Sequence, residues 1–324
     1  DSSAASDVYK RQAIRLYETL GNPFKRTYTL VITANVYRDQ GDNEKAMHYL
    51  QQGMEIQTKH RLTLQQAFTI TSMANIYWDQ GNIDESLQLY KDLVQKNRNV
   101  GYAEGLSHSL LRLSERLLSL DQPDEALPYL LENTTVLRQL GDRRQEASVW
   151  STIATIYTEN PDQHQEGVEA WGRVRDLRKQ TGDLQEELDA LDGMARLYRK
   201  ADPSKALEHF KDALKLAQKL DHRPKQGDLL NSMGITEWST GNYAEALELY
   251  ERALEIFREL DDRIHAGLML NSIGVTLKHL RRQDEAQARL QEALQVNRHT
   301  GERLLEGHSL AALGDVCSEL GHCE

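Results

Sequence analysis

Cysteine, proline and long apolar runs are all scarce in this chain of 324 residues. The two cysteines, Cys317 and Cys323, are too few for a disulfide framework, and their spacing does not suit a zinc site. We interpret them as incidental thiols in a reducing compartment, which favours a cytoplasmic protein. No run of residues approaches the roughly 20 apolar positions needed to cross a bilayer, so we expect no membrane partner.

Long basic segments are also missing. The chain has 39 basic and 50 acidic residues, for a net charge of -11, and its densest basic spots are the pairs Arg143-Arg144 and Arg281-Arg282. A surface with this balance of charge repels the phosphate backbone of nucleic acids. We therefore expect no nucleic-acid partner.

The common catalytic and nucleotide-binding motifs are absent as well. The sequence contains no G-x-x-x-x-G-K loop, no G-x-G-x-x-G turn, no H-E-x-x-H helix and no G-x-S-x-G elbow. The 11 histidines are scattered, and no two of them form an i, i+4 pair that suits a metal ion. The sequence therefore predicts a protein that is not an enzyme, with no catalytic residues, no metal site and no cofactor.

What the chain does contain is an internal repeat of about 40 residues. Two small residues recur in each repeat, at intervals of 39 to 41 residues. The first recurs at Ala34, Ala74, Ser114, Ala154, Ala195, Gly234, Gly274 and Gly314, and the second at Ala46, Ser86, Ala126, Gly167, Ala206, Ala246 and Ala286. Small residues let two helix backbones approach closely while a large neighbour fills the remaining space.

Each repeat has the pattern of two antiparallel helices joined by a tight turn. Within residues 70–77, apolar side chains recur at i, i+3, i+4 and i+7, which is typical of one face of a helix. Turn signals follow at Gly41-Asp42, Gly81-Asn82 and Gly241-Asn242. We expect each glycine to end a first helix in the left-handed conformation, and the next residue to cap the second helix.

These features together resemble the tetratricopeptide repeat (TPR) family, in a variety with longer, 40-residue repeats. The family pattern has a small residue at the eighth place, an aromatic at the eleventh, alanine at the twentieth and an aromatic at the twenty-fourth. The eleventh place is aromatic at Tyr37, Tyr77, Tyr157 and Tyr198. The resemblance implies an all-α fold, a right-handed superhelical solenoid of antiparallel helix pairs. Similar repeats occur in kinesin light chains, in spindle-orientation adaptors and in bacterial signalling proteins that carry an ATPase, kinase or caspase-like domain.

The repeats also predict how the chain is divided. Residues 2–12 read SSAASDVYKRQ, which resembles a translated sequencing adapter, so we treat residues 1–12 as non-native. Residues 13–324 are expected to form a single solenoid. It would comprise a partial repeat at 13–26, seven full repeats at about 27–301 and an unpaired first helix at 302–324. The uncapped ends of such an array would expose apolar faces, and they could promote self-association.

Four departures from the repeat are expected to have local effects. An insertion at 160–164 lengthens one turn, and a one-residue deletion at 200–203 shortens another. Pro128 falls inside a second helix, where it removes a backbone donor and can kink the helix. Glu237 occupies the place of an aromatic residue, and we expect a partly exposed side chain there.

In this family the first helices of successive repeats line a concave groove, and the resemblance implies a set of partner-binding residues there. They are Tyr28, Asn35, Arg38, Phe68, Asn75, Trp78, Arg196, Arg199, Asn231, Trp238, Asn271 and Lys278.

For each group of these residues a second interpretation remains open. Asn35 and Asn75 could clamp the backbone of a peptide, or could bond locally. Trp78 and Trp238 could be binding hot spots, or could pack between repeats. The basic spot at Arg196 and Arg199 could receive an acidic peptide, or could be neutralised by acidic side chains on the same helix.

Three functions follow from this reading. The first is a protein-interaction scaffold that binds a protein or peptide in the concave groove. The second is a regulatory or sensor arm of a larger signalling protein, whose ATPase, kinase or protease domain lies outside this sequence. The third is a regulator that binds a small signalling peptide.

Overall fold

The computed structural model describes the backbone of residues 2–320 and the side chains of residues 9–319, except that of residue 161. Within these residues there are sixteen α-helices and one 3₁₀ helix, and no strand. The helices are α1 (Ser2–Thr19), α2 (Pro23–Asp39), α3 (Asn43–Lys59), α4 (Thr63–Asp79), α5 (Ile83–Val100), α6 (Ala103–Ser119), α7 (Pro123–Leu140), α8 (Arg143–Glu159), η1 (Pro161–Gln163), α9 (His164–Thr181), α10 (Leu184–Ala201), α11 (Pro203–Lys219), α12 (Arg223–Ser239), α13 (Tyr243–Glu259), α14 (Arg263–His279), α15 (Gln283–Thr300) and α16 (Arg303–Leu320).

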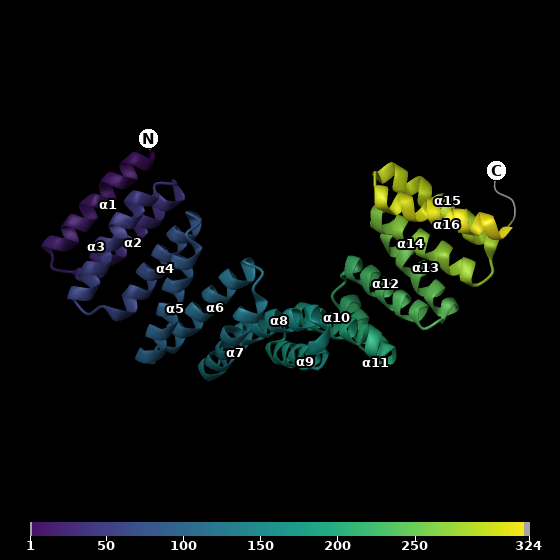
Figure 1. Ribbon diagram of the computed structural model, residues 1–324, viewed down its shortest axis with the longest axis horizontal. Helices are drawn as coiled ribbons and strands as arrows, with labels where there is room; N and C mark the ends of the chain where they lie inside the picture. Colours follow the sequence, from purple (N-terminus) through teal and green to yellow (C-terminus); the bar gives the residue numbers. More distant parts are fainter. Residues whose placement is uncertain (1, 321–324) are drawn as a thin grey trace. The chain divides into compact units, whose positions relative to one another are not determined.

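The chain forms two compact units, residues 1–149 and residues 150–324, and the boundary falls inside α8. Within each unit, consecutive helices lie side by side and run in alternating directions (Figure 1). The expected partners pack together, for example α2 with α3 in the first unit and α14 with α15 in the second. Each unit is therefore an all-α stack of antiparallel helix pairs, as the repeat pattern predicted.

Among the described residues, α1 precedes the series α2 to α15 and α16 follows it. The division of the chain into a partial repeat, seven full repeats and an unpaired first helix stays a prediction. Because α1 runs without a break from Ser2 to Thr19, the structure does not mark a boundary at residue 12. The assignment of residues 1–12 to an adapter stays a prediction.

The small residues of the repeat lie at the contacts between paired helices. Ala34, Ala74, Ala195 and Ala246 are fully buried. In the second unit the contact is close enough to require glycine, because a Cβ atom at Gly234 would lie 2.6 Å from the ring of Tyr250. The recurring small residues thus set the distance between helices, and in the second unit one buried core runs from Leu188 on α10 to Val316 on α16.

Turn chemistry explains where most first helices end. Gly41 has a φ of +81° and terminates the turn after α2, since a left-handed residue cannot continue the helix. Asp42 then caps α3, and its carboxylate accepts a hydrogen bond of 3.1 Å from the backbone N–H of Lys45. A hydrogen bond from the Lys45 ammonium and this backbone bond hold the pKa of Asp42 below its ordinary value.

The expected caps at Asn82 and Asn242 are wrong. Neither side chain makes a capping hydrogen bond to its helix. The reason is visible at Asn242, whose amide donates instead to the carboxylate of Glu237 at 2.8 Å. The same hydrogen bond explains how the half-buried Glu237 side chain is tolerated in place of an aromatic residue.

The insertion, the deletion and the internal proline are each accommodated by a local change that leaves the order of the helices intact. The inserted residues form η1, where the Asn160 side chain accepts a hydrogen bond from the backbone of Asp162. In the shortened repeat, Asp202 both ends α10 and caps α11 through the backbone N–H of Lys205. Pro128 lies inside α7, which continues through it from Pro123 to Leu140.

Two expectations on composition can be compared with the structure. Cys317 is disulfide-bonded, so the expectation of a free thiol at this residue is wrong, and Cys323 lies outside the described residues. Among the described helices, none has the length and apolar character needed to cross a membrane.

Candidate functional site

An apolar groove of the first unit lies between α2 and α4, the first helices of two successive repeats. It has a volume of about 510 Å³ and is lined by Phe24, Lys25, Tyr28, Val31, Ile32, Asn35, Gln65 and Phe68. Three predicted binding residues, Tyr28, Asn35 and Phe68, therefore come together in one cavity.

The aromatic side chains of this groove are unusually open to solvent. Phe68 is 71% exposed, Tyr28 is 62% exposed and Phe24 is 57% exposed. By contrast, aromatic residues of the core such as Phe210 are fully buried. Exposed aromatic residues gathered in one place are characteristic of a protein-interaction surface rather than of a solvated helix face.

Polar contacts hold the two walls of the groove together. The hydroxyl of Thr27 donates to the side-chain oxygen of Gln65 at 3.0 Å, and the Gln65 amide donates to the backbone carbonyl of Phe24 at 3.3 Å. These bonds join α2 to the first turn of α4. Val31, which is only 9% exposed, belongs to the buried core beneath the cavity.

Asn35 and Asn75 occupy the same place in consecutive repeats but have different surroundings. The side-chain oxygen of Asn75 accepts two hydrogen bonds, from the Tyr90 hydroxyl at 2.7 Å and from the Arg116 guanidinium at 2.8 Å. Asn35 is half-buried, and no hydrogen-bond partner for its side chain is found among the described residues. Of the two amides, Asn35 is the one that keeps both its donor and its acceptor for a ligand.

Trp78 and Arg38 are engaged between repeats. The Arg116 guanidinium lies 4.5 Å from the centre of the Trp78 ring, an arrangement that favours a cation–π interaction. Arg38 pairs with Asp39 on its own helix at 2.9 Å and with Asp79 on α4 at 3.8 Å. Both side chains are half-buried, so part of each remains open beside these contacts.

The basic spot predicted in the second unit is largely neutralised. Arg196 pairs with the buried carboxylate of Asp192 at 3.0 Å, and Lys225 pairs with the same carboxylate at 2.9 Å and with Asp189 at 3.3 Å. Burial lowers the pKa of Lys225, but the Asp192 and Asp189 carboxylates outweigh it and hold this pKa above its ordinary value. Arg199 lies one turn further along α10 and is half-buried.

The four remaining predicted residues lie on α12 and α14. The Trp238 ring makes edge contacts with Tyr243 and His279, at centroid distances of 6.0 and 5.4 Å. Lys278 pairs with Asp315 on α16 at 2.8 Å. Asn231 and Asn271 are half-buried, and the side-chain oxygen of Asn271 is covered and lacks a hydrogen-bond partner among the described residues.

Sequence reasoning missed Phe24 and Ile32, which complete the groove on α2. Together with Tyr28 they form a stripe at i, i+4 and i+8 along one helix face. This spacing was visible in the sequence, but only Tyr28 of the three residues stands at one of the family's groove positions.

Comparison with known proteins now decides the family. A tetratricopeptide repeat model matches residues 145–219, 203–259 and 225–299, and two further tetratricopeptide repeat models match residues 69–100 and 30–60. The chain belongs to the tetratricopeptide repeat family. No curated protein matches the sequence of this TPR chain.

Several solved structures share the TPR fold at low sequence identity. A signal transduction ATPase with numerous domains and a tetratricopeptide repeat sensor, from Pyrococcus horikoshii, aligns with a TM-score of 0.59 and 14% identity. The alignment covers 92% of this chain and 50% of that protein, so the TPR chain spans half of its length. The kinesin light chain TPR-like repeats of Podospora anserina align with a TM-score of 0.51 and 19% identity, over 60% of this chain and 96% of the other. Aspartyl phosphate phosphatase F of Bacillus subtilis aligns with a TM-score of 0.52 and 11% identity, over 96% and 93%.

Proposed function

We propose that this TPR chain is a non-enzymatic scaffold, and that the groove between α2 and α4 holds an apolar segment of a partner protein or peptide. The observation that carries the proposal is the cluster of three exposed aromatic rings, Phe24, Tyr28 and Phe68, around a cavity of about 510 Å³. A buried aromatic ring removes roughly 150–250 Å² from water, so such rings dominate the energetics of interfaces. The unpaired amide of Asn35 at the edge of the cavity can bond the backbone of the bound segment.

Removal of one aromatic wall of the groove is expected to weaken partner binding at least tenfold. Peptides selected from a displayed random library on the wild-type chain would serve as probes, and fluorescence polarisation would measure their dissociation constants. Phe68→Ala and Tyr28→Ala should each raise the dissociation constant, because each removes apolar surface that the peptide covers. Neither change should alter the helical circular dichroism, since both rings are exposed.

Leu304→Ala is the matched control, because Leu304 is also 71% exposed but lies on α16, outside the groove. It should leave the affinity unchanged. Selected peptides that bind Phe68→Ala and Tyr28→Ala as tightly as the wild type would refute the placement of the site.

A second candidate is the regulatory arm of a larger signalling protein. It is favoured by the alignment of 92% of this chain with half of the Pyrococcus horikoshii signal transduction ATPase, whose name includes a tetratricopeptide repeat sensor. The two functions share the same groove but differ in what adjoins it. A full-length gene in which the repeats are followed or preceded by no ATPase, kinase or protease domain would rule out this second candidate.

We further propose that the end of the array bearing α16 associates with another copy of the chain. Leu310 on α16 is 46% exposed, whereas Leu270, at the same place on α14, is buried beneath α15. An apolar face of this kind lowers its free energy when it is covered. Sedimentation velocity should therefore show a weight-average mass that rises with concentration, and Leu310→Glu should remove the effect. A wild-type chain that stays monomeric at high concentration would contradict this expectation.

The proposal also covers the cellular location of the protein and the classes of partner that it binds. We propose a cytoplasmic protein that binds protein or peptide and binds neither nucleic acid nor membrane. Its net charge of -11 and the absence of long basic segments argue against binding to nucleic acid. Residues 13–324 are proposed to be the native repeat array.

A further inference from the structure

A recurring charged cluster stands at the junction between the second helix of one repeat and the first helix of the next. At the end of α7, Arg138 donates from Nε to Oε1 of Glu146 at 3.0 Å. Arg143, at the start of α8, donates from Nη1 to Oε2 of the same carboxylate at 2.9 Å. The Glu146 side chain is only 2% exposed, so one buried carboxylate is held between two guanidinium groups.

The same cluster occurs at the junction of α15 and α16. Arg298 donates from Nε to Oε1 of Glu306 at 2.8 Å, and Arg303 pairs through Nη1 with Oε2 at 3.4 Å. The hydrogen bond from Arg298 holds the pKa of Glu306 below its ordinary value, despite partial burial of the carboxyl. In both clusters the arginines precede the glutamate by eight and by three residues.

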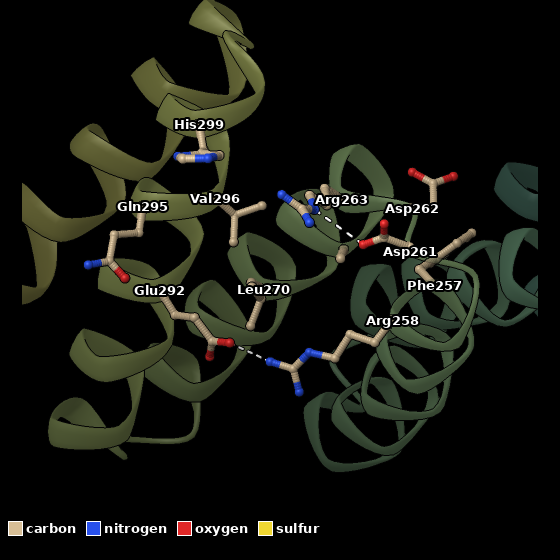
Figure 2. A pocket seen from close by; sticks show the side chains of 11 residues that line it. Phe257, Arg258, Asp261, Asp262, Arg263, Leu270, Glu292, Gln295, Val296 and His299 are labelled. Carbon is tan, nitrogen blue, oxygen red and sulfur yellow. Dashed lines mark hydrogen bonds and ion pairs between the residues drawn. The ribbon is translucent and has the colours of Figure 1, made fainter.

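The junction of α13 and α14 has both arginines but lacks the carboxylate. Arg258 and Arg263 precede residue 266 by the same eight and three positions, and residue 266 is alanine. A cavity of about 510 Å³ opens at this place, lined by both arginines and by Ala266. Figure 2 shows the arginine side chains on one side of this cavity and α15, with Glu292, Gln295 and His299, on the other.

Because residue 266 carries no carboxylate, Arg258 and Arg263 pair with other acidic side chains, which a bound carboxylate could displace. Arg263 pairs with Asp261 at 3.2 Å, and their side chains are 61% and 82% exposed, so solvent screens the pair. Arg258 pairs with Glu292, which also accepts from Arg289 at 3.3 Å. Glu292 would therefore keep one basic partner if Arg258 turned toward a ligand.

The rest of the cavity suits the carbon chain next to such a carboxylate. Leu270 and Phe257 are buried side chains of its floor, and Val296 is half-buried beside them. His299 stands at the rim on α15 and can donate a further hydrogen bond (Figure 2). Asp261, Asp262 and Glu292 line the cavity too, and each pairs with a basic side chain: Asp261 with Arg263, Glu292 with Arg258 and Asp262 with His265. Apolar side chains beside guanidinium groups are the features that recognise an aliphatic carboxylate.

We propose that this cavity binds a carboxylate group of a partner peptide. The bound carboxylate would take the place that the Glu146 and Glu306 side chains hold in the two other clusters. The site is separate from the groove between α2 and α4, and it stands or fails independently of that groove. The bound group would lie between Arg258 and Arg263, and its alkyl portion would contact Leu270 and Val296.

The test follows the Nε–H signals of Arg258 and Arg263 by nuclear magnetic resonance during titration of small probes. N-acetyl-glutamate amide carries a side-chain carboxylate, N-acetyl-alanine carries a chain-terminal one, and N-acetyl-glutamine amide carries none. We expect saturable shifts with at least one of the two acids and at least tenfold weaker binding of the glutamine probe. The acid that binds more tightly identifies whether a side chain or a chain terminus is the source of the carboxylate.

Variants of the chain separate the site from general charge effects. The double change Arg258→Gln with Arg263→Gln should weaken binding of the acids at least tenfold. The matched control, Arg138→Gln with Arg143→Gln, should leave it unchanged, because those arginines are already occupied by Glu146. Ala266→Glu should place both Nε–H signals near their ligand-bound positions without any probe. Equal binding of the acids and the glutamine probe, or unchanged binding by the Arg258/Arg263 variant, would overturn the proposal.

Discussion

Replacement of Phe210 by alanine is expected to cost about 4 kcal/mol of folding free energy, the largest effect of any change considered for this TPR chain. Phe210 lies on α11 and is fully buried in a cluster that includes Leu191, Leu230 and Tyr250. Its ring fills the space that the small residues leave between neighbouring helices. Loss of the ring removes its transfer free energy and also leaves a cavity that packed helices cannot fully close.

The Phe210→Ala change can be measured by urea unfolding and by amide hydrogen exchange. Because each helix pair in a repeat array packs mainly on its neighbours, the loss of protection should be greatest in α10, α11 and α12. Phe68→Ala provides the control, since it deletes the same ring at a site that is 71% exposed, and it should shift stability by less than about 0.5 kcal/mol. Similar losses in the two variants would contradict the assignment of Phe210 to the core.

The second large effect is expected from Gly234→Leu, which should destabilise the chain by about 3 kcal/mol. A Cβ atom at Gly234 would already lie 2.6 Å from Cε1 of Tyr250 and 2.8 Å from Cδ1. The three further carbon atoms of leucine have no room unless α12 and α13 move apart. That movement would disturb contacts along the whole helix pair, because the interior is close-packed.

Gly172→Leu is the matched control for this effect. Gly172 lies in the interior of α9, and a Cβ atom there would meet no other atom within 4 Å. Leucine has a higher helix propensity than glycine, so this variant should be more stable by up to about 0.8 kcal/mol. Thermal unfolding followed by circular dichroism would compare the two, and destabilisation of both variants to the same extent would refute the steric argument.

The fold could be predicted from the sequence because its determinants repeat. A small residue such as Ala34 or Ala246 is uninformative by itself, but its return at each 40-residue interval identifies a helix contact. The turn at Gly41 was predictable for the same reason. The caps at Asn82 and Asn242 were not, because an amide can bond several nearby groups, and the choice of Glu237 by Asn242 depends on side-chain positions.

The candidate site was predictable only in part. Tyr28 and Phe68, two of the family's groove positions, line one cavity because both lie on first helices of adjacent repeats. The Arg116 guanidinium donates a hydrogen bond to the side-chain oxygen of Asn75, 41 positions earlier in the chain. This contact depends on side-chain conformation, which the pattern of residue types does not specify. The exposure of Phe24 is likewise a property of the folded surface.

If the proposed groove binds a partner, the two hydrogen bonds of Gln65 have a kinetic consequence. They fasten α4 to α2 before a ligand arrives, so the walls of the groove need little rearrangement to receive it. A receptor of this kind loses little conformational entropy on complex formation, and its encounter rate depends weakly on details of the contact. Natural variation in the groove residues would then tune how long a partner stays bound, while the speed of its capture stays nearly constant.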